Sequence, residues 1–167
     1  SDVCSSDLLV TAVGCEALRN NTSGGSTALG FQAGYSNTSG TILAIGSNAL
    51  RNNTTASNNT AVGNNSLSNN TTGQENTAVG SGALYGNITG IRNTAIGNSA
   101  LQNNTNSYNT AIGHAASGSN TSGTENTSIG VDAMFYNTTG NYNTAIGRSA
   151  LLNNTASSNT EIGRAHV

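Results

Sequence analysis

Very few side chains in this sequence could support catalysis. Between residues 9 and 160 there is one histidine, His114, at a corner position of a repeat, where we expect an exposed surface residue. Glu75 and Glu125 fall at equivalent loop positions in separate repeats, whereas Glu16 falls at a different one. At about 4.8 Å per repeat, Glu75 and Glu125 would be too far apart to act as the paired carboxylates of glycoside hydrolysis. The sequence therefore predicts a protein that is not an enzyme.

Patterns that bind metals or cofactors are also lacking. The Gly-Gly-x-Gly-x-Asp repeat of calcium-binding β-rolls does not occur, and acidic residues are too sparse to coordinate hard cations. A phosphate-binding glycine loop would end in Lys, and the sequence contains no Lys. Cys15 is the single cysteine over residues 9–160, so no disulfide framework is expected there. We predict no catalytic, cofactor or metal site.

Two groups of side chains could instead contact sugars. Tyr35, Tyr85 and Phe135 share one position of the repeat and could form a stripe that stacks against sugar rings. The simpler interpretation, which we favour, is that these rings pack against the adjacent loop. Triplets such as Asn70-Thr71-Thr72 match the acceptor pattern for N-glycosylation, but in a repeat rich in Asn and Thr we interpret them as structural.

These residues belong to a repeat that accounts for nearly the whole sequence. Thr-Ala-aliphatic-Gly recurs in steps of 16 or 17 residues, and the copy at Asn93-Thr94-Ala95-Ile96-Gly97 continues into Asn98-Ser99-Ala100-Leu101. A short fixed period indicates a solenoid in which each repeat forms one coil. Nine complete coils precede a tenth copy, and the copies begin at Thr11, Thr27, Leu43, Thr60, Thr77, Thr94, Thr110, Thr127, Thr144 and Thr160.

The composition favours stacked β-coils over a conventional globular core. The chain has 28 Asn, 23 Thr and 21 Gly among 167 residues, and only 7% of its residues are charged, against roughly 25% in ordinary domains. Asn, Thr and Gly are poor helix formers, and each apolar block is too short for a helix. We predict an all-β solenoid of nine coils with two short strands per coil, a Gly at the bend and an Asn-rich loop that adopts left-handed backbone conformations.

Each coil is numbered from its Thr, so that position 3 is aliphatic, position 4 is Gly and position 8 is mostly Leu. Side chains alternate along a strand, so positions 1 and 3 share one face and positions 2 and 4 the other. We predict that positions 3 and 8 fill the interior, and that the small face of positions 2 and 4 admits another backbone, from the same coil or from a second chain. The predicted core is Val13, Ile45, Val62, Val79, Ile96, Ile112, Ile129, Ile146, Leu18, Leu50, Leu67, Leu84, Leu101 and Leu151, and the predicted corner glycines are Gly14, Gly30, Gly46, Gly63, Gly80, Gly97, Gly113, Gly130 and Gly147.

Such a core is small for the length of chain that it must order. Two apolar side chains per coil contribute roughly 1.5–3 kcal/mol each, whereas ordering the backbone costs about 1–2 kcal/mol per residue. Coils two and seven have Gly34 and Ser117 at position 8, so we expect them to be the weakest, and we expect Leu at 117 to raise thermal stability. Lateral association of identical chains would add to the stacking of neighbouring coils.

Both ends of the sequence differ from the repeat. Residues 2–8 and 161–167 can be back-translated into nucleotide strings that are reverse complements of each other and that resemble a common sequencing adapter. We therefore expect residues 1–8 and 161–167 to be sequencing artefacts, and the repeat domain to span 9–160 as a fragment of a longer protein.

Charge and hydropathy exclude two kinds of partner for the repeat domain. Over residues 9–160 the formal net charge is zero, so there is no basic surface for nucleic acid. No apolar run approaches the ~20 residues that a membrane-spanning helix needs, so we predict no direct insertion into a membrane. The four acids are Glu16, Glu75, Glu125 and Asp132, and the four arginines are Arg19, Arg51, Arg92 and Arg148.

The motif Asn-Thr-Ala-Ile-Gly followed by x-x-Ala-Leu is similar to the head repeats of trimeric autotransporter adhesins. It occurs, for example, at Asn76-Thr77-Ala78-Val79-Gly80 and Asn143-Thr144-Ala145-Ile146-Gly147. It also resembles the Thr-Ala-Ile-Gly repeats of phage-tail-like and surface fibre proteins that end in an intramolecular-chaperone domain. The resemblance covers essentially all of residues 9–160 and implies a left-handed parallel β-roll. It also implies three chains side by side, outside the cell on an outer-membrane-anchored bacterial surface, or on a virion.

Two functions are compatible with these features. The first is a structural or adhesive fibre segment, a homotrimer whose exposed loops bind a host surface protein or a glycan. The second is a lattice-binding solenoid, such as an ice-binding protein, in which the position-1 Thr side chains form a regular outward row. We favour the fibre, because the Thr shares a face with the apolar position 3 and an ice-binding face usually has two parallel Thr rows.

Overall fold

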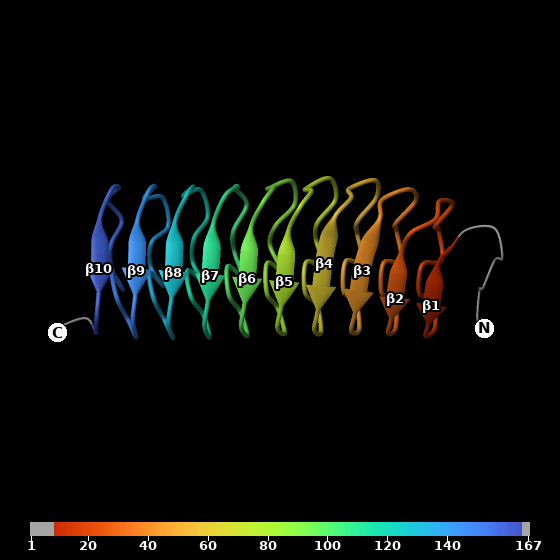
Figure 1. The fold of residues 1–167 in the computed structure, drawn as a ribbon, viewed down its shortest axis with the longest axis horizontal. Coiled ribbons are helices and arrows are strands. Elements are labelled where there is room, and N and C mark those ends of the chain that lie inside the picture. Colours follow the sequence, from red (N-terminus) through yellow and green to blue (C-terminus); the bar gives the residue numbers. More distant parts are fainter. Residues whose placement is uncertain (1–8, 165–167) are drawn as a thin grey trace.

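The computed structural model describes residues 9–164, and the expected artefacts at 1–8 and 165–167 lie outside that range. The described chain is an all-β rod of stacked coils about nine turns long (Figure 1), so the prediction of an all-β solenoid is confirmed. Each coil contributes one strand, and all strands form a single parallel sheet in chain order. The strands are β1 Thr11–Val13, β2 Thr27–Leu29, β3 Ile42–Ile45, β4 Asn59–Val62, β5 Thr77–Val79, β6 Thr94–Ile96, β7 Thr110–Ile112, β8 Thr127–Ile129, β9 Thr144–Ile146 and β10 Thr160–Ile162.

Successive strands pair so that the same position of each coil stacks on its counterpart. Between β5 and β6, for example, Thr lies opposite Thr, Ala opposite Ala and Val79 opposite Ile96. The last strand keeps this register, with Glu161 opposite Ala145 of β9. Residues 161–163 therefore follow the geometry of the coil, and the origin of the two ends stays a prediction. Within 9–164 no helix has the length and apolar character that crossing a membrane requires.

The second apolar segment of each coil is not a strand, so the prediction of two strands per coil is wrong. From position 5 to position 10 the chain forms consecutive turns, in which backbone N–H groups alternate between two kinds of acceptor. In coil three, Ala49 donates to the carbonyl of Gly46 within the same coil (3.2 Å), whereas Leu50 donates to that of Ser66 in coil four (3.0 Å). In a regular parallel sheet the alternate N–H groups would pair with the coil on the other side. Here they bond within their own coil, as Arg51 N–H does to the carbonyl of Asn48 at 3.3 Å, so no regular strand ladder forms.

Left-handed backbone occurs at positions 6 and 8 of this turning arm, where it was not expected, and also in the Asn-rich loop, where it was predicted. In that loop Asn58, Glu75 and Tyr108, each two residues before the next position-1 residue, have φ between 60° and 63°. In eight coils a residue other than Gly occupies position 8 with φ between 47° and 52°, as Leu50 and Leu101 do at 49°. A left-handed conformation costs an L-residue about 1–2 kcal/mol. Alternation of left- and right-handed residues bends the chain into a tight arc, and complete burial of the Leu side chain offsets this cost.

The strand presents its Ala to the interior, not its larger aliphatic side chain, which corrects the predicted core. Ala78 and Ala95 at position 2 are fully buried, whereas position 3 is 36–48% exposed in six coils and half-buried in the other three. Leu from position 8 fills the narrow cross-section and leaves room for little more than a methyl group on the facing strand. The position-3 residues predicted to lie in the core, but found on the outer face, are Val13, Ile45, Val62, Val79, Ile96, Ile112, Ile129 and Ile146.

The predictions for positions 8 and 4 are confirmed. Position 8 points inward, with Leu50, Leu67, Leu84 and Leu101 fully buried, Leu18 nearly so and Leu151 partly buried in the last coil. The glycines at position 4 have φ between 124° and 140°, which a side chain would strain. A Cβ atom on any of these glycines would lie 2.0–2.6 Å from the backbone of the next coil's glycine, so this corner admits no side chain. The corner glycines are Gly14, Gly30, Gly46, Gly63, Gly80, Gly97, Gly113, Gly130 and Gly147.

Two coils lack a large side chain at position 8, and in each case a second departure from the repeat accommodates its absence. In coil two, a Cβ on Gly34 would lie 2.9 Å from Cδ1 of Ile42, so Ile42 occupies the space that the Leu would fill. In coil seven, the buried Ser117 hydroxyl donates to Oγ of Ser128 at 3.0 Å, and Ser128 replaces the position-2 Ala of coil eight. This polar pair divides the apolar core into one cluster over coils one to seven and another over coils eight and nine.

We expect Ser117→Leu combined with Ser128→Ala to raise the melting temperature by roughly 5 °C. The double variant would bury an additional Leu, worth about 1.5–3 kcal/mol, at roughly 2–4 °C per kcal/mol for a chain of this size. Ser117→Leu alone should gain less, because it leaves the Ser128 hydroxyl buried against an apolar side chain. The measurement is thermal unfolding followed by circular dichroism, and a double variant that melts below the parent chain would contradict the packing described for this coil.

Candidate functional site

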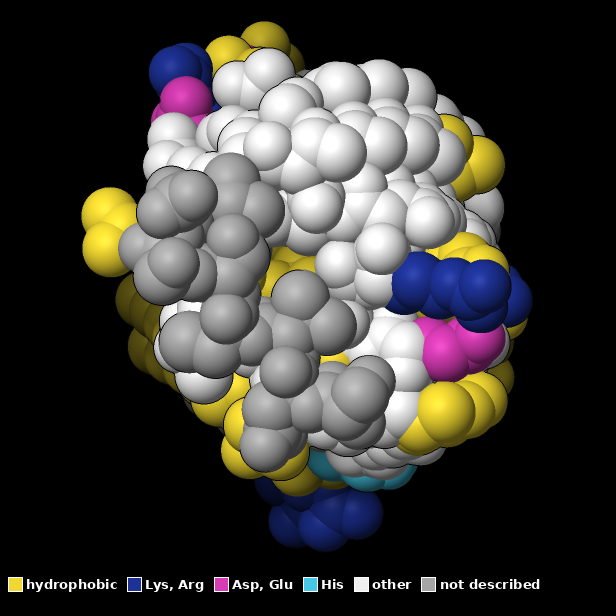
Figure 2. All heavy atoms as spheres, turned by 90° about the vertical axis from the view of Figure 1, so that its right-hand side faces the viewer, with side chains coloured by type: hydrophobic (Ala, Val, Ile, Leu, Met, Phe, Trp, Pro, Cys, Tyr) yellow, Lys and Arg dark blue, Asp and Glu magenta, His cyan; other side chains and the backbone are white. Residues whose placement is uncertain are grey.

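The side chains that could take part in catalysis or metal binding are dispersed over the rod. His114 is exposed, as expected, and its Nδ1 lies 4.0 Å from Oδ1 of Asp132 in the next coil. In Figure 2, which views the rod end-on, the charged side chains form separate spots around the circumference. Among residues 9–164, no three His, Cys, Asp or Glu side chains are grouped so that they could hold a metal ion. Glu75 and Glu125 occupy equivalent loop positions, with φ of 60° and 56°, but three coils separate them.

One polar network links the first three coils. Gln32 bridges it, donating to Oε2 of Glu16 at 2.7 Å and accepting from Nε of Arg51 at 2.8 Å. Arg19 also donates to Glu16, and the Arg19 and Arg51 guanidinium groups lie 5.9 and 5.8 Å from the centre of the Tyr35 ring. The hydrogen bond from Gln32 is the main reason that the pKa of Glu16 is lowered, and Arg19 lowers it further. Glu16 is therefore held as a carboxylate that joins coils, which does not suit a proton donor.

A second network joins coils four, five and six on the loop side. Arg92 donates from Nε to Oε2 of Glu75 at 2.8 Å and from Nη1 to the Tyr108 hydroxyl at 3.4 Å. Its guanidinium also lies 5.8 Å from the centre of the Tyr108 ring. The hydrogen bond from Arg92, together with its positive charge, lowers the pKa of Glu75. This network likewise links neighbouring coils through an exposed ion pair.

The three position-9 aromatics have different surroundings. Tyr35 lies between two arginines, and Phe135 packs on coil seven, because a Cβ on Gly118 would lie 3.0 Å from the Phe135 ring. Phe135 also makes an edge-to-face contact with Tyr136, with ring centroids 4.7 Å apart. Tyr35 and Phe135 therefore pack as predicted, but against the turning arms of neighbouring coils and not against the loop, whereas Tyr85 is 41% exposed. Tyr85 alone of the three can offer a free ring face to a ligand.

The Asn-rich loops are tied together by a buried row of amides at position 11. Asn70 is fully buried, and its Nδ2 donates both to Oδ1 of Asn53 in the preceding coil and to the carbonyl of Gly73, each at 2.9 Å. Asn87 in turn donates to Oδ1 of Asn70 at 3.0 Å. The interpretation of Asn70-Thr71-Thr72 as structural is thereby supported, because the Asn70 amide faces the interior.

A second amide row is formed by the final Asn of each coil, just before the next strand. Asn76 donates from Nδ2 to the carbonyl of Gly90 at 2.8 Å, and its Oδ1 accepts from the backbone N–H of Asn93 at 2.9 Å. The same pattern recurs from Asn59 to Asn143. Asn recurs at fixed positions of the sequence, and in the structure these Asn side chains form much of the buried polar part of each coil.

The position-11 row is interrupted at coil six. In the 16-residue coil six, Asn104 donates to the carbonyl of Asn106, two residues on, and Oδ1 of Asn87 is left buried without a partner. Farther on, Oδ1 of Asn120 accepts from the backbone N–H of Gly123 in its own loop, 3.0 Å away. In coil six the amide is thus turned from the preceding coil towards its own loop. Coil two, which also has 16 residues, keeps the row, because Asn37 donates to Oδ1 of Asn21 at 2.9 Å.

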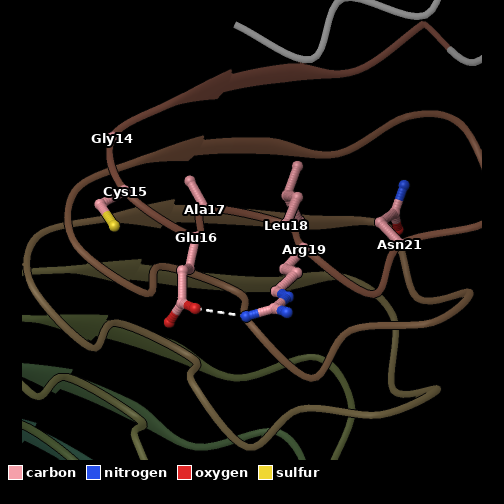
Figure 3. A pocket seen from close by; sticks show the side chains of 7 residues that line it. All are labelled: Gly14, Cys15, Glu16, Ala17, Leu18, Arg19 and Asn21. Carbon is pink, nitrogen blue, oxygen red and sulfur yellow. Dashed lines mark hydrogen bonds and ion pairs between the residues drawn. The ribbon is translucent and has the colours of Figure 1, made fainter. Parts of the chain in front are cut away.

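Two hollows on the surface of residues 9–164 bear on ligand binding. A cavity of about 550 Å³ lies at coil one, the first coil of the described chain, and its lining includes Cys15, Ala17 and Leu18 (Figure 3). In inner coils the equivalent Leu side chains are fully buried, so this cavity belongs to the end of the described stack and not to the repeating surface of the rod.

The other hollow is a shallow groove along coils two to six, which we call the amide groove. It consists of two adjoining cavities of about 340 and 310 Å³ that share Asn65 and Tyr85. Neither the repeat period nor the composition predicted it. Its lining residues are Phe31, Gln32, Asn48, Arg51, Asn52, Asn65, Ser68, Asn69 and Tyr85 in the first cavity, continued by Ser81, Gly82, Asn98, Ser99 and Gln102 in the second.

We expect Asn70→Ala to lower the free energy of unfolding by about 2–3 kcal/mol, because it removes one amide from a buried row and leaves its neighbours' polar groups without partners. Asn103→Ala is the matched control: Asn103 is exposed, and its loss should change stability by less than about 0.5 kcal/mol. Urea denaturation followed by circular dichroism measures both. Equal losses in the free energy of unfolding for the two variants would contradict a stabilising role of the buried row.

Comparison with protein-family models, with curated proteins and with solved structures gives no match for this chain. Its function therefore has to be inferred from the surfaces that the coils themselves build.

Proposed function

We propose that this chain is a non-enzymatic structural or adhesive segment of a homotrimeric fibre. The fibre would be displayed outside the cell, on an anchored bacterial surface or on a virion, as a left-handed roll of three chains. Its variable loops would contact a host surface protein or a glycan. The observation that carries the proposal is the outer face of the ten-stranded sheet.

That face bears two straight rows of side chains. The position-3 side chains form an aliphatic row, with one exposed or half-exposed residue per coil, as at Val79, Ile96 and Ile112. The position-1 Thr side chains form a second row beside it, because positions 1 and 3 of a strand point the same way. A continuous aliphatic row on a neutral surface is typical of a surface that is covered by a partner.

A second copy of the same chain fits this surface better than an irregular partner. The rows repeat at the spacing of parallel strands, about 4.8 Å, and an identical solenoid repeats at that same spacing along its whole length. Covering half of an aliphatic side chain contributes roughly 1 kcal/mol, and nine coils would add these contributions in register. This placement replaces the predicted interface of Ala and Gly, because position 2 is buried within each coil.

We expect the purified chain to scatter light with about three times the mass of one chain. Replacing Val79, Ile96 and Ile112 by Thr should reduce that mass towards a single chain while circular dichroism stays β-rich, because Thr keeps the β-propensity but removes apolar area. Ile88→Thr is the control: Ile88 is exposed outside the row, at a position where the other coils carry Thr. A folded monomeric parent chain would overturn the trimer.

A second candidate function is binding to a regular lattice such as ice. The observation in its favour is that the Thr row lies on the outer face of a straight sheet. Against it, the neighbouring row is aliphatic and not a second row of Thr.

We expect a solution of the chain to show no thermal hysteresis above that of a non-binding protein at equal concentration, because one Thr row beside an aliphatic row offers too few regularly placed hydroxyls. Hysteresis that is lost in a Thr94→Tyr, Thr110→Tyr variant would instead establish the lattice function, since these substitutions would disrupt the flat row without altering the core. The control is Thr121→Tyr, which places the same side chain on an exposed loop away from the Thr row.

A further inference from the structure

We propose that the amide groove binds a linear, uncharged oligosaccharide that lies along the axis of the rod. This inference rests on the proposed function, in which the fibre contacts a glycan, and it assigns that contact to one surface. The groove extends over five successive coils, roughly 19 Å at the spacing of parallel strands. That length and its shallow profile suit an extended chain of sugar rings better than a compact small molecule.

The groove exists because two small residues interrupt columns of larger ones. At position 9, the buried Ser68 of coil four lies between Arg51 of coil three and Tyr85 of coil five. At position 6, Gly82 of coil five lies between Asn65 and Ser99. A Cβ built on Gly82 would have only Oγ of Ser99 nearby, at 3.8 Å, so its space is open. The hollow is thus made by side-chain choice, and the backbone repeats unchanged beneath it.

The lining has the chemistry that sugar hydroxyl groups require. Its polar side chains are mainly amides and hydroxyls, and each Asn or Gln amide offers both a donor and an acceptor to neighbouring hydroxyl groups. Phe31 at one end and Tyr85 at the centre are 50% and 41% exposed and supply apolar ring faces. Tyr85 borders both cavities, so a ligand that spans the groove must pass it.

The charge of the lining selects against anionic ligands and against cleavage. Arg51 is the only charged side chain among the lining residues, and its Nε is already bound to Gln32 at 2.8 Å. A single engaged arginine is too little for a polyanion such as nucleic acid. The lining residues include no carboxylate, so the groove provides binding without the acid and base of a glycoside hydrolase.

The groove can operate within the proposed trimer. Its residues come from positions 5, 6, 9 and 10, on the turning arm of the coil, whereas the aliphatic row and the Thr row lie on the strand. The two surfaces share no residue. Chain association and sugar binding can therefore be disrupted independently.

The test is isothermal titration of the whole chain with cellotetraose, chitotetraose and, as an anionic probe, tetragalacturonate. We expect at least one neutral tetrasaccharide to bind. Tyr85→Ala should weaken that binding about tenfold, the loss typical of truncating a central aromatic contact. Gly82→Asn should abolish it by filling the groove, and it should fold, because Asn48 and Asn65 occupy the same position of their coils with φ of 58° and 56°. Tyr142→Ala is the control, since Tyr142 is exposed outside the groove, and it should change the affinity less than twofold.

Each contrary result overturns a defined part of the inference. Absence of heat with both neutral probes at millimolar concentration would overturn sugar binding, and tighter binding of tetragalacturonate would overturn the preference for uncharged ligands. Binding that Tyr85→Ala and Gly82→Asn leave unchanged would overturn its location. Light scattering on the same samples separates these failures from that of the fibre: a trimer that binds no sugar leaves the fibre intact, whereas a monomer that binds sugar removes the fibre and retains the groove.

Discussion

Backbone contact between coils at the position-4 glycines is the constraint on which the rest of this structure depends. Each of these glycines lies so close to the next that a Cβ atom would overlap the neighbouring carbonyl at 2.0–2.6 Å. The coils can therefore stack at the ordinary spacing of hydrogen-bonded parallel strands only if this corner carries no side chain. One strand and one turning arm must then enclose the interior within a very narrow cross-section. Leu in a left-handed conformation on one side and Ala on the other satisfy that condition, and larger pairs would not fit.

The choice of Asn for the polar part of the interior follows from the same stacking. A charged side chain at a buried, repeated position would face an identical charge about 4.8 Å away in every coil. Asn avoids this repulsion, because an amide carries a donor and an acceptor and can bind its own copy in the next coil. The carbonyl of Gly90 illustrates the economy of the arrangement, since it accepts from both Asn76 and Asn87. The two amide rows thus supply donors to loop carbonyls inside the coil.

The sequence predicts what the period controls. It indicated the number of coils, the parallel stacking, the corner glycines and the inward position of Leu50 and its equivalents, since each of these repeats with the period. It could not decide which strand face is inside, because alternation separates Ala95 from Ile96 without saying which points inward. Hydrophobicity favoured Ile96, and this was wrong. A better signal was size: position 2 is Ala in eight coils and Ser in one, whereas position 3 varies among Val, Leu and Ile.

The paired exceptions in the sequence contain more structural information than the consensus. Ser117 and Ser128 depart from the pattern at different positions of adjacent coils, and the hydrogen bond between them shows that position 8 of one coil meets position 2 of the next. Gly34 and Ile42 depart from the pattern within one coil, and the Ile42 side chain fills the space that Gly34 leaves. The amide groove was missed for the converse reason. Ser68 and Gly82 are single departures with no compensating partner, so they leave a hollow where a perfect repeat would leave none. In a solenoid, an uncompensated small residue on the outer face marks a place where a ligand, and not the chain itself, can supply the missing contacts.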